Sequence, residues 1–164
     1  MKTPFAVLIA LAALLPAGET RPLFTIERSL NRNVLHYDAN LDGGGALDSR
    51  EPVVAYWIMV EKGGVREDLT LLEKTRAYGF KAEAADDGEG FILRLKALDA
   101  RPVRIKQQDG EVWAEALIGG RPCRLDRITI TNEGENLIPK VLSIDLHGTD
   151  RKTGQACRET LPGD

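Results

Sequence analysis

The sequence predicts a mainly β protein, a single-domain antiparallel β-sandwich or barrel with one short helix. Apolar and polar residues alternate with a period of two through most of the chain, as they do on half-buried strands. Turn sequences rich in glycine separate these segments, and Asp109-Gly110 is a strong signal for a two-residue hairpin. One segment, which begins at Thr70, has the pattern of a helix instead.

About seven to nine short strands follow from this alternation. Residues 53–60 are apolar on both faces, so they are expected to form a central strand covered from both sides. A change of phase near Asp126-Arg127 predicts a β-bulge. The remaining strands are expected around the alternating apolar residues Phe24, Ile26, Leu30, Phe91, Leu93, Leu95, Val103, Ile105, Val112, Ala114, Ala116, Ile118, Leu125, Ile128, Ile130, Leu142, Ile144 and Leu146.

The expected helix begins with a capping box formed by Thr70 and Glu73. Gly79 stands where such a helix would end. The spacing predicts about two to three turns. Four residues then share one helical face: Leu71, Leu72, Thr75 and Tyr78.

Residues 1–18 resemble a secretory signal peptide, which leaves residues 19–164 as one β-rich domain. Lys2 supplies a positive charge, residues 5–15 are an unbroken apolar stretch, and Pro16-Ala17-Gly18 is a typical cleavage context. The alternatives are a membrane anchor or a buried first helix, but the apolar stretch is shorter than the roughly 20 residues of a membrane span. We therefore expect a periplasmic or secreted protein with no membrane span in its mature form.

The composition excludes one broad class of partner. The chain carries 22 basic and 25 acidic residues, for a net charge of −3. Because general nucleic-acid binding needs clustered positive charge, no nucleic-acid partner is expected.

The two cysteines, Cys123 and Cys157, are expected to form a disulfide if the protein is exported. Such a bond would close a loop of about 35 residues and stabilise the fold by about 3–4 kcal/mol. The alternative is two free buried thiols. A metal site is less favoured, because two cysteines without a nearby pair of histidines lack the ligands of a tetrahedral site.

No recognisable catalytic motif is present. The sequence leaves open whether the protein is an enzyme, but it favours a non-enzymatic role. Ser143, Asp145 and His147 lie on one face of a strand, but the aspartate stands in the middle, where a triad needs the imidazole. His36 and His147 are the only histidines, and a site built from them and a nearby acid such as Glu51 is the enzyme alternative. No cofactor is indicated.

The stretch from Asp38 through Asn40 to Asp42 resembles the first half of a calcium loop, with oxygen ligands at positions one, three and five and a glycine at six. The second half does not fit, because Ser49 stands at position twelve where a bidentate glutamate is needed. The alternative is a glycine-rich connection in which these residues cap turns.

A basic surface follows from the expected hairpin registers. Pairing Leu95 with Ile105 sets Arg94 opposite Lys106, and the Asp109-Gly110 turn sets Lys106 opposite Trp113. Like charges that face each other across strands are unfavourable unless they are neutralised. Arg94, Lys106 and Trp113 are therefore a candidate site for an anionic or carbohydrate small ligand, the alternative being a solvated outer face.

Short pieces in a fixed order carry a family resemblance. They are Ser29-Leu30-Asn31-Arg32-Asn33-Val34, Tyr37, Pro52-Val53-Val54-Ala55-Tyr56-Trp57, Leu69-Thr70, Ala77-Tyr78-Gly79, Ile144-Asp145-Leu146-His147-Gly148 and Thr153-Gly154. On these pieces the chain resembles an uncharacterised bacterial family of small exported proteins, the domain-of-unknown-function 4833 family. The resemblance covers most of the chain from about Leu23 onward. It implies an exported location and a domain boundary, but no mechanism.

The polar and aromatic residues of these pieces are further candidates for ligand contact, with folding and packing as the alternative role. They are Asn31, Arg32, Asn33, Tyr37, Tyr56 and Trp57. Our leading hypothesis is a non-enzymatic binding or interaction module of the cell envelope. The competing hypotheses are a hydrolase-like envelope enzyme around His36 and His147 and a calcium-stabilised structural domain.

Overall fold

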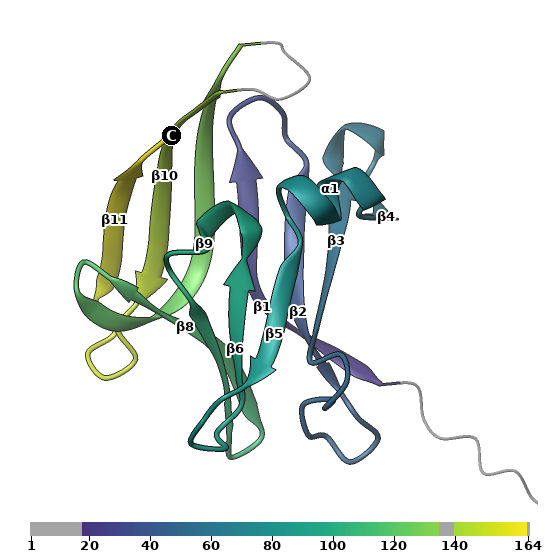
Figure 1. The fold of residues 1–164 in the computed structure, drawn as a ribbon, viewed down its shortest axis with the longest axis vertical. Coiled ribbons are helices and arrows are strands. Elements are labelled where there is room, and N and C mark those ends of the chain that lie inside the picture. The colour runs from purple at the N-terminus through teal and green to yellow at the C-terminus, as the bar shows by residue number, and fades with distance from the viewer. Residues whose placement is uncertain (1–17, 135–139, 164) are drawn as a thin grey trace, which may run out of the picture.

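The computed structural model describes residues 18–134 and 140–163, so the expected signal peptide lies outside the described residues except for Gly18. The described residues form eleven strands, one α-helix and two 3₁₀ turns (Figure 1). The strands are β1 (Glu19–Arg28), β2 (Val34–Leu41), β3 (Val53–Met59), β4 (Val65–Asp68), β5 (Phe80–Ala84), β6 (Phe91–Leu95), β7 (Val103–Gln108), β8 (Glu111–Ile118), β9 (Arg121–Glu133), β10 (Lys140–Thr149) and β11 (Ala156–Pro162). The helix α1 spans Leu71–Arg76, and the 3₁₀ turns η1 and η2 span Val60–Lys62 and Lys96–Leu98.

All eleven strands belong to one sheet that is curled into a half-barrel, and not to the two facing sheets of a sandwich. The strand order is β4-β3-β2-β1-β9-β8-β7-β6-β5, with β10 paired to β9 and β11 paired to β10. The expectation of a mainly β fold with one short helix is therefore confirmed. The fully antiparallel arrangement is wrong in one place, because β1 and β9 run parallel. No hairpin constrains the direction of these two strands, which are about a hundred residues apart in the sequence.

The core lies on the inner face of the curled sheet. Alternation places one set of side chains from every long strand there, and fully buried members include Leu35, Tyr37, Leu93 and Ile105. The outer face carries the polar set of the same strands. Two local expectations are confirmed: the turn at Asp109-Gly110 has positive φ angles of 52° and 78°, and Asp126 is the extra residue of a bulge between β9 and β10.

The strand β3 is not the doubly covered central strand that its apolar sequence predicts. Val53 and Trp57 are buried on the inner face, whereas Val54 and Tyr56 on the outer face are only half-buried. The reason is its position: β3 lies next to the terminal strand β4, and the described residues place no second layer on the outer face. Leu30 is likewise 46% exposed, because β1 ends at Arg28.

The helix α1 is shorter than the sequence predicts, although its capping box is formed as expected. Leu71 and Leu72, two of the residues expected to share one helical face, are 78% and 57% exposed. The chain leaves the helix early because Gly79 packs against it: a Cβ on Gly79 would lie 1.8 Å from the carbonyl oxygen of Lys74. Only glycine permits this approach, which turns the chain into β5.

The expected disulfide between Cys123 and Cys157 is present and joins β9 to β11, which are not neighbours in the sheet. The strand between them, β10, contributes Gly148 at this level, paired with Leu125 and Cys157. A Cβ on Gly148 would lie 2.2 Å from the carbonyl oxygen of Arg124. Among the described residues, no helix has the length and apolar character needed to cross a membrane.

Candidate functional site

A cleft of about 390 Å³ lies where the curled sheet fails to close, between β3 and the start of β5. The strand β3 pairs with β4 only from Tyr56 onward, so the described residues give residues 53–55 no strand partner on that side. The strand β5 pairs with β6 alone. The cleft therefore separates two incompletely paired strands.

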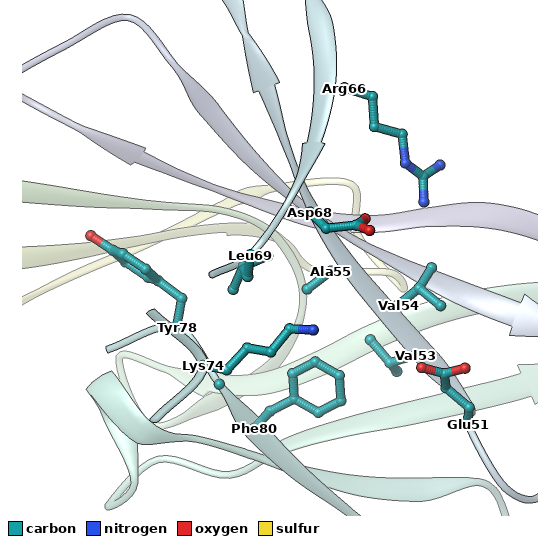
Figure 2. Close-up of a pocket in the computed structure, with 11 residues that line it drawn as sticks. Glu51, Val53, Val54, Ala55, Arg66, Asp68, Leu69, Lys74, Tyr78 and Phe80 are labelled. Atoms are coloured by element: carbon teal, nitrogen blue, oxygen red, sulfur yellow. The ribbon is translucent and has the colours of Figure 1, made fainter. Parts of the chain in front are cut away.

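The lining of the cleft mixes aromatic, basic and acidic side chains (Figure 2). Figure 2 shows the side chain of Lys74 extended across the cleft from α1 toward β3, with Phe80 below it. The lining residues are Glu51, Val53, Val54, Ala55, Arg66, Asp68, Leu69, Lys74, Tyr78, Gly79 and Phe80.

Three of the charged side chains in this lining have no ion-pair or hydrogen-bond partner among residues 18–134 and 140–163. They are the ammonium of Lys74 and the carboxylates of Glu51 and Asp68. Arg66 is held differently, since its guanidinium lies 3.7 Å from the centre of the Tyr56 ring. Charged groups without protein partners are available to hydrogen-bond a ligand.

An aromatic cluster supports the inner wall of the cleft. The fully buried Tyr37 stacks on Phe24 at 4.7 Å and meets the edge of Phe80 at 5.9 Å. Its hydroxyl donates a hydrogen bond of 2.7 Å to the carbonyl oxygen of Tyr78, which fixes the segment between α1 and β5. Burial raises the pKa of Tyr37 well above its ordinary range, so the phenol stays protonated as the donor.

A second contact holds α1 against the sheet. Trp57 meets the Tyr78 ring edge-on at 5.4 Å and donates its indole N–H to Glu73 at 3.0 Å. The Arg28 guanidinium lies over both rings, 4.6 Å from the centre of Trp57 and 5.6 Å from that of Tyr78. Tyr37 and Trp57, two candidates for ligand contact, therefore pack in the interior behind the cleft.

Tyr56 lies on the outer face, next to the cleft. Its hydroxyl donates a 2.6 Å hydrogen bond to Oδ2 of the buried Asp38, and its ring stacks with His36 at 5.4 Å. Burial and the bond to Asp38 raise the pKa of Tyr56 to about 12. The Arg66 guanidinium covers the Tyr56 ring and also lines the cleft. Tyr56 is therefore the one aromatic candidate of the sequence analysis that borders the cleft from the outer face.

The three candidates in the β1–β2 connection organise that turn. The side-chain oxygen of Asn31 accepts a bond from the Asn33 backbone, and that of Asn33 accepts one from the Glu61 backbone. The backbone N–H of Arg32 donates to the Glu61 carboxylate at 3.4 Å. None of the three lines the cleft.

The pairing of β6 with β7 differs from the one that predicted the basic surface. Phe91 and not Leu95 pairs with Ile105, because η2 takes up residues that the prediction assigned to the strand. Arg94 therefore faces Lys81 of β5 and not Lys106. The pairing of Lys106 with Trp113 is confirmed, and Lys106 is neutralised by Glu115 at 2.9 Å.

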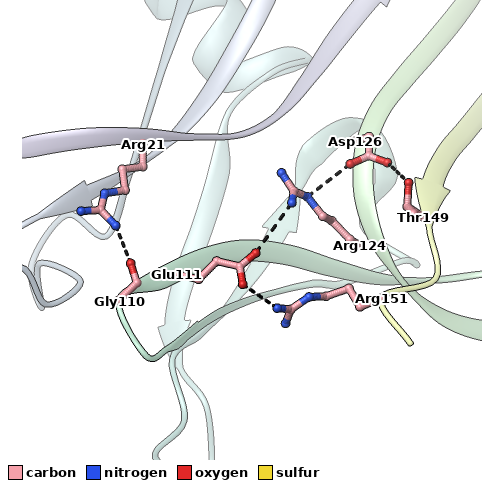
Figure 3. Close-up of polar contacts among 7 residues, drawn as sticks. All are labelled: Arg21, Gly110, Glu111, Arg124, Asp126, Thr149 and Arg151. Atoms are coloured by element: carbon pink, nitrogen blue, oxygen red, sulfur yellow. Dashed lines mark hydrogen bonds and ion pairs between the residues drawn. The ribbon is translucent and has the colours of Figure 1, made fainter. Parts of the chain in front are cut away.

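Lys106 and Trp113 line a second cavity, of about 700 Å³, together with the turn between β5 and β6. The Trp113 ring is covered by the Arg151 guanidinium at 3.5 Å from its centre, and its indole N–H is buried without a hydrogen-bond partner among the described residues. Figure 3 shows Arg151 held by Glu111, which also lies 3.8 Å from Arg124. The face of Trp113 is thus already occupied by a protein cation.

The same figure shows how neighbouring strands are linked to this network. Arg124 pairs with Asp126 at 3.3 Å, and Asp126 accepts a bond from Thr149 at 2.8 Å. Arg21 of β1 donates to the carbonyl oxygen of Gly110 in the β7–β8 turn. These contacts connect β1, β8, β9 and β10 on the side of the molecule away from α1.

The two histidines lie in one row across the sheet but are separated by two strands. His36 pairs with Thr25, Thr25 with Arg127, and Arg127 with His147. Three strand spacings amount to about 14 Å, too far for a shared proton or metal ion. Burial, followed by Arg127 and Arg158, lowers the pKa of His147 below its ordinary value.

Two of the three candidate calcium ligands lie in the strand β2. Asp38 and Asn40 belong to β2, where side chains on one face are about 6–7 Å apart, and so they do not wrap a loop around an ion. Asp42 accepts bonds from the backbone N–H groups of Gly44 and Ala46, and Asn40 donates to the carbonyl oxygen of Glu51. Within the described residues, no group of three or more His, Cys, Asp or Glu side chains is arranged to hold a metal ion.

Three side chains that line the cleft were not singled out by the sequence reasoning. Lys74, Phe80 and Arg66 come from separate segments that meet only when the sheet curls. The available signal was the set of family pieces, because Leu69-Thr70 and Ala77-Tyr78-Gly79 border the cleft directly.

The comparison with known families supports the resemblance noted in the sequence. No curated protein and no solved structure matches the chain. The model of a domain of unknown function, DUF4833, matches residues 24–160, a span that runs from β1 into β11 and includes every residue that lines the cleft. The chain therefore belongs to the DUF4833 family.

Proposed function

We propose that this protein is a non-enzymatic binding module that acts outside the cytoplasm, and that the cleft between β3 and β5 takes a small ligand bearing a carboxylate, such as a sugar acid. Export is supported by the signal-like residues 1–18 and is compatible with the disulfide.

One observation carries the choice of site. Lys74 crosses the cleft with no ion-pair or hydrogen-bond partner for its ammonium among the described residues, and the aromatic ring of Phe80 lies beside it. A cation next to an aromatic surface is suited to a ligand that has both a carboxylate and an apolar face. The ring of a sugar acid offers both.

The remaining polar groups of the lining complete this chemistry. Glu51 and Asp68 are hydrogen-bond acceptors for hydroxyl groups, and Arg66 adds a second cation at the outer rim. A neutral sugar would leave Lys74 unpaired, and a simple inorganic anion would not contact the Phe80 ring. The lining therefore favours a hydroxylated carboxylate over either.

Titration of the purified protein with glucuronate, followed by NMR or calorimetry, tests this function, with glucose as the neutral control. We expect saturable binding of glucuronate that is weakened about tenfold by Lys74→Gln, because a charge-assisted bond is lost. Lys152→Gln, in an exposed turn, is the matched control and should leave the affinity unchanged. Equal affinities of the Lys74→Gln variant and the unaltered protein would exclude this cleft as the site.

The Lys106–Trp113 cavity is the second candidate site, favoured by the unpaired indole N–H of Trp113. The same titration distinguishes the two places. If Lys106→Gln and not Lys74→Gln lowers the affinity for glucuronate, the ligand binds in the second cavity.

A further inference from the structure

The strand β5 presents a free edge. It stands at one end of the strand order, and its only strand partner among the described residues is β6. Lys81, Glu83 and Ala84 are exposed, and β5 contains neither a proline nor a bulge that would block pairing with a further strand.

The direction of the backbone groups follows from the bonds at the two ends of β5. The carbonyl oxygen of Gly79 accepts from Lys96, and the N–H of Ala85 donates to Gly90, so both residues face the β6 side. Successive residues of a strand point their backbone groups in opposite directions. Phe80, Ala82 and Ala84 therefore direct their N–H and C=O groups toward the free edge.

The side chains of β5 have a pattern that is complementary to itself. Lys81 and Glu83 stand on either side of Ala82, and neither has an ion-pair partner in the described parts of the chain. If two β5 strands pair antiparallel about Ala82, each lysine lies opposite the glutamate of the other copy. Opposite charges in directly opposed positions stabilise a strand pair.

The other two edges of the sheet are different, because most of their charges are already engaged. On β4, Glu67 pairs with Lys62 and Arg66 covers Tyr56. On β11, Glu159 pairs with Arg101, and Pro162 cannot donate a backbone bond. Asp68 of β4 is also unpaired among the described residues, but it has no basic neighbour on its strand other than Arg66, so only β5 carries an unpaired lysine and glutamate that can face each other across a two-fold axis.

We propose that β5 is a docking edge for a second copy of this chain, which pairs antiparallel with it across a two-fold axis at Ala82. The backbone groups of Phe80, Ala82 and Ala84 supply about six hydrogen bonds between the copies. The Lys81–Glu83 pairs occupy the positions between these bonds, where opposed side chains are closest. The inference rests on the edge of β5 and not on the identity of the ligand, although Phe80 of this edge also lines the cleft.

Sedimentation equilibrium over a range of protein concentrations tests the proposal. Because one pair of short strands buries little surface, we expect a reversible dimer whose population rises with concentration. Lys81→Glu or Glu83→Lys alone places like charges opposite each other and should weaken self-association about tenfold. The double variant Lys81→Glu/Glu83→Lys restores the complementary pattern and should dimerise like the unaltered protein.

An equal mixture of the two single variants gives the sharpest result. The Lys81→Glu chain then carries two glutamates and the Glu83→Lys chain two lysines, so the two chains should form a heterodimer although neither self-associates well. Both residues are exposed, so each variant is expected to fold, and circular dichroism checks this. A protein that stays monomeric at all concentrations, or a dimer that the single reversals leave unchanged, would overturn the proposal.

Discussion

The two sides of the half-barrel are held together by different means. On the side of β8, β9 and β11, a disulfide joins Cys123 to Cys157, and Arg101 makes two bonds of 2.8 and 2.9 Å to the Glu159 carboxylate. On the side of β3, β5 and α1, single hydrogen bonds from Tyr37 and Trp57 hold the segment that borders the cleft.

This difference shows how a small sheet protein can leave part of its edge open. Covalent and charged links on one side stabilise the fold without closing the barrel. The other side then retains an unclosed cleft and a free strand edge, the features that carry both proposals. The following predictions test this division, beginning with the largest effect.

Replacement of both cysteines by alanine should lower the free energy of unfolding by about 3–4 kcal/mol, because the unfolded chain regains the entropy of the closed loop. Urea unfolding of the variant and of the unaltered protein measures the loss. If the loss is below about 1 kcal/mol, the disulfide does not dominate the stability of this side.

Glu159→Gln should cost about 1–2 kcal/mol, because Arg101 loses a charged partner and the N–H of Gly119 loses a charged acceptor. The bonds from Arg101 and Gly119 lower the pKa of Glu159 below its ordinary value of 4.5. Its contribution is therefore complete above about pH 4.5 and is lost as the pH falls through the lowered pKa.

Unfolding measured at neutral pH and near pH 3 checks this prediction. The difference between Glu159→Gln and the unaltered protein should narrow in acid. Glu67→Gln, which removes the exposed pair with Lys62, is the control and should cost only a few tenths of a kcal/mol. A difference that stays constant down to low pH would contradict the role of the carboxylate.

Tyr37→Phe should cost about 1 kcal/mol and act on the open side, because it leaves the carbonyl oxygen of Tyr78 without the donor of a part-buried hydrogen bond. Hydrogen exchange should accelerate in residues 77–84 and remain unchanged in β10 and β11. Tyr78→Phe is the matched control, since it removes a longer bond of 3.3 Å to Arg28. Equal acceleration over the whole sheet would argue against an independent open side.

Thr70→Ala should have the smallest effect, about 0.5–1 kcal/mol, through loss of the capping box. Thr75→Ala, in the same helix, removes only a hydroxyl that bonds to the carbonyl oxygens of Leu71 and Leu72 and should be close to neutral. If the Thr70 variant also weakens ligand binding, α1 is needed to position Lys74.

Local patterns explain which expectations were confirmed. The Asp109-Gly110 hairpin, the Thr70 capping box and the bulge at Asp126 each depend on a few neighbouring residues. The expectations for β3 and for the β6–β7 register were wrong because both depend on what lies next to a strand. The apolar sequence of β3 predicts cover on two faces, but its place beside the terminal strand β4 leaves one face half-exposed.

The sequence by itself determined the strand-rich class, the helix start and the two cysteines that pair, because alternation, capping and composition act over short distances. Only the tertiary structure decided that β1 and β9 run parallel, that the sheet curls into a half-barrel, and that Lys74, Phe80 and Arg66 line one cleft. These features depend on contacts between residues far apart in the chain, which side-chain packing selects and no local pattern encodes.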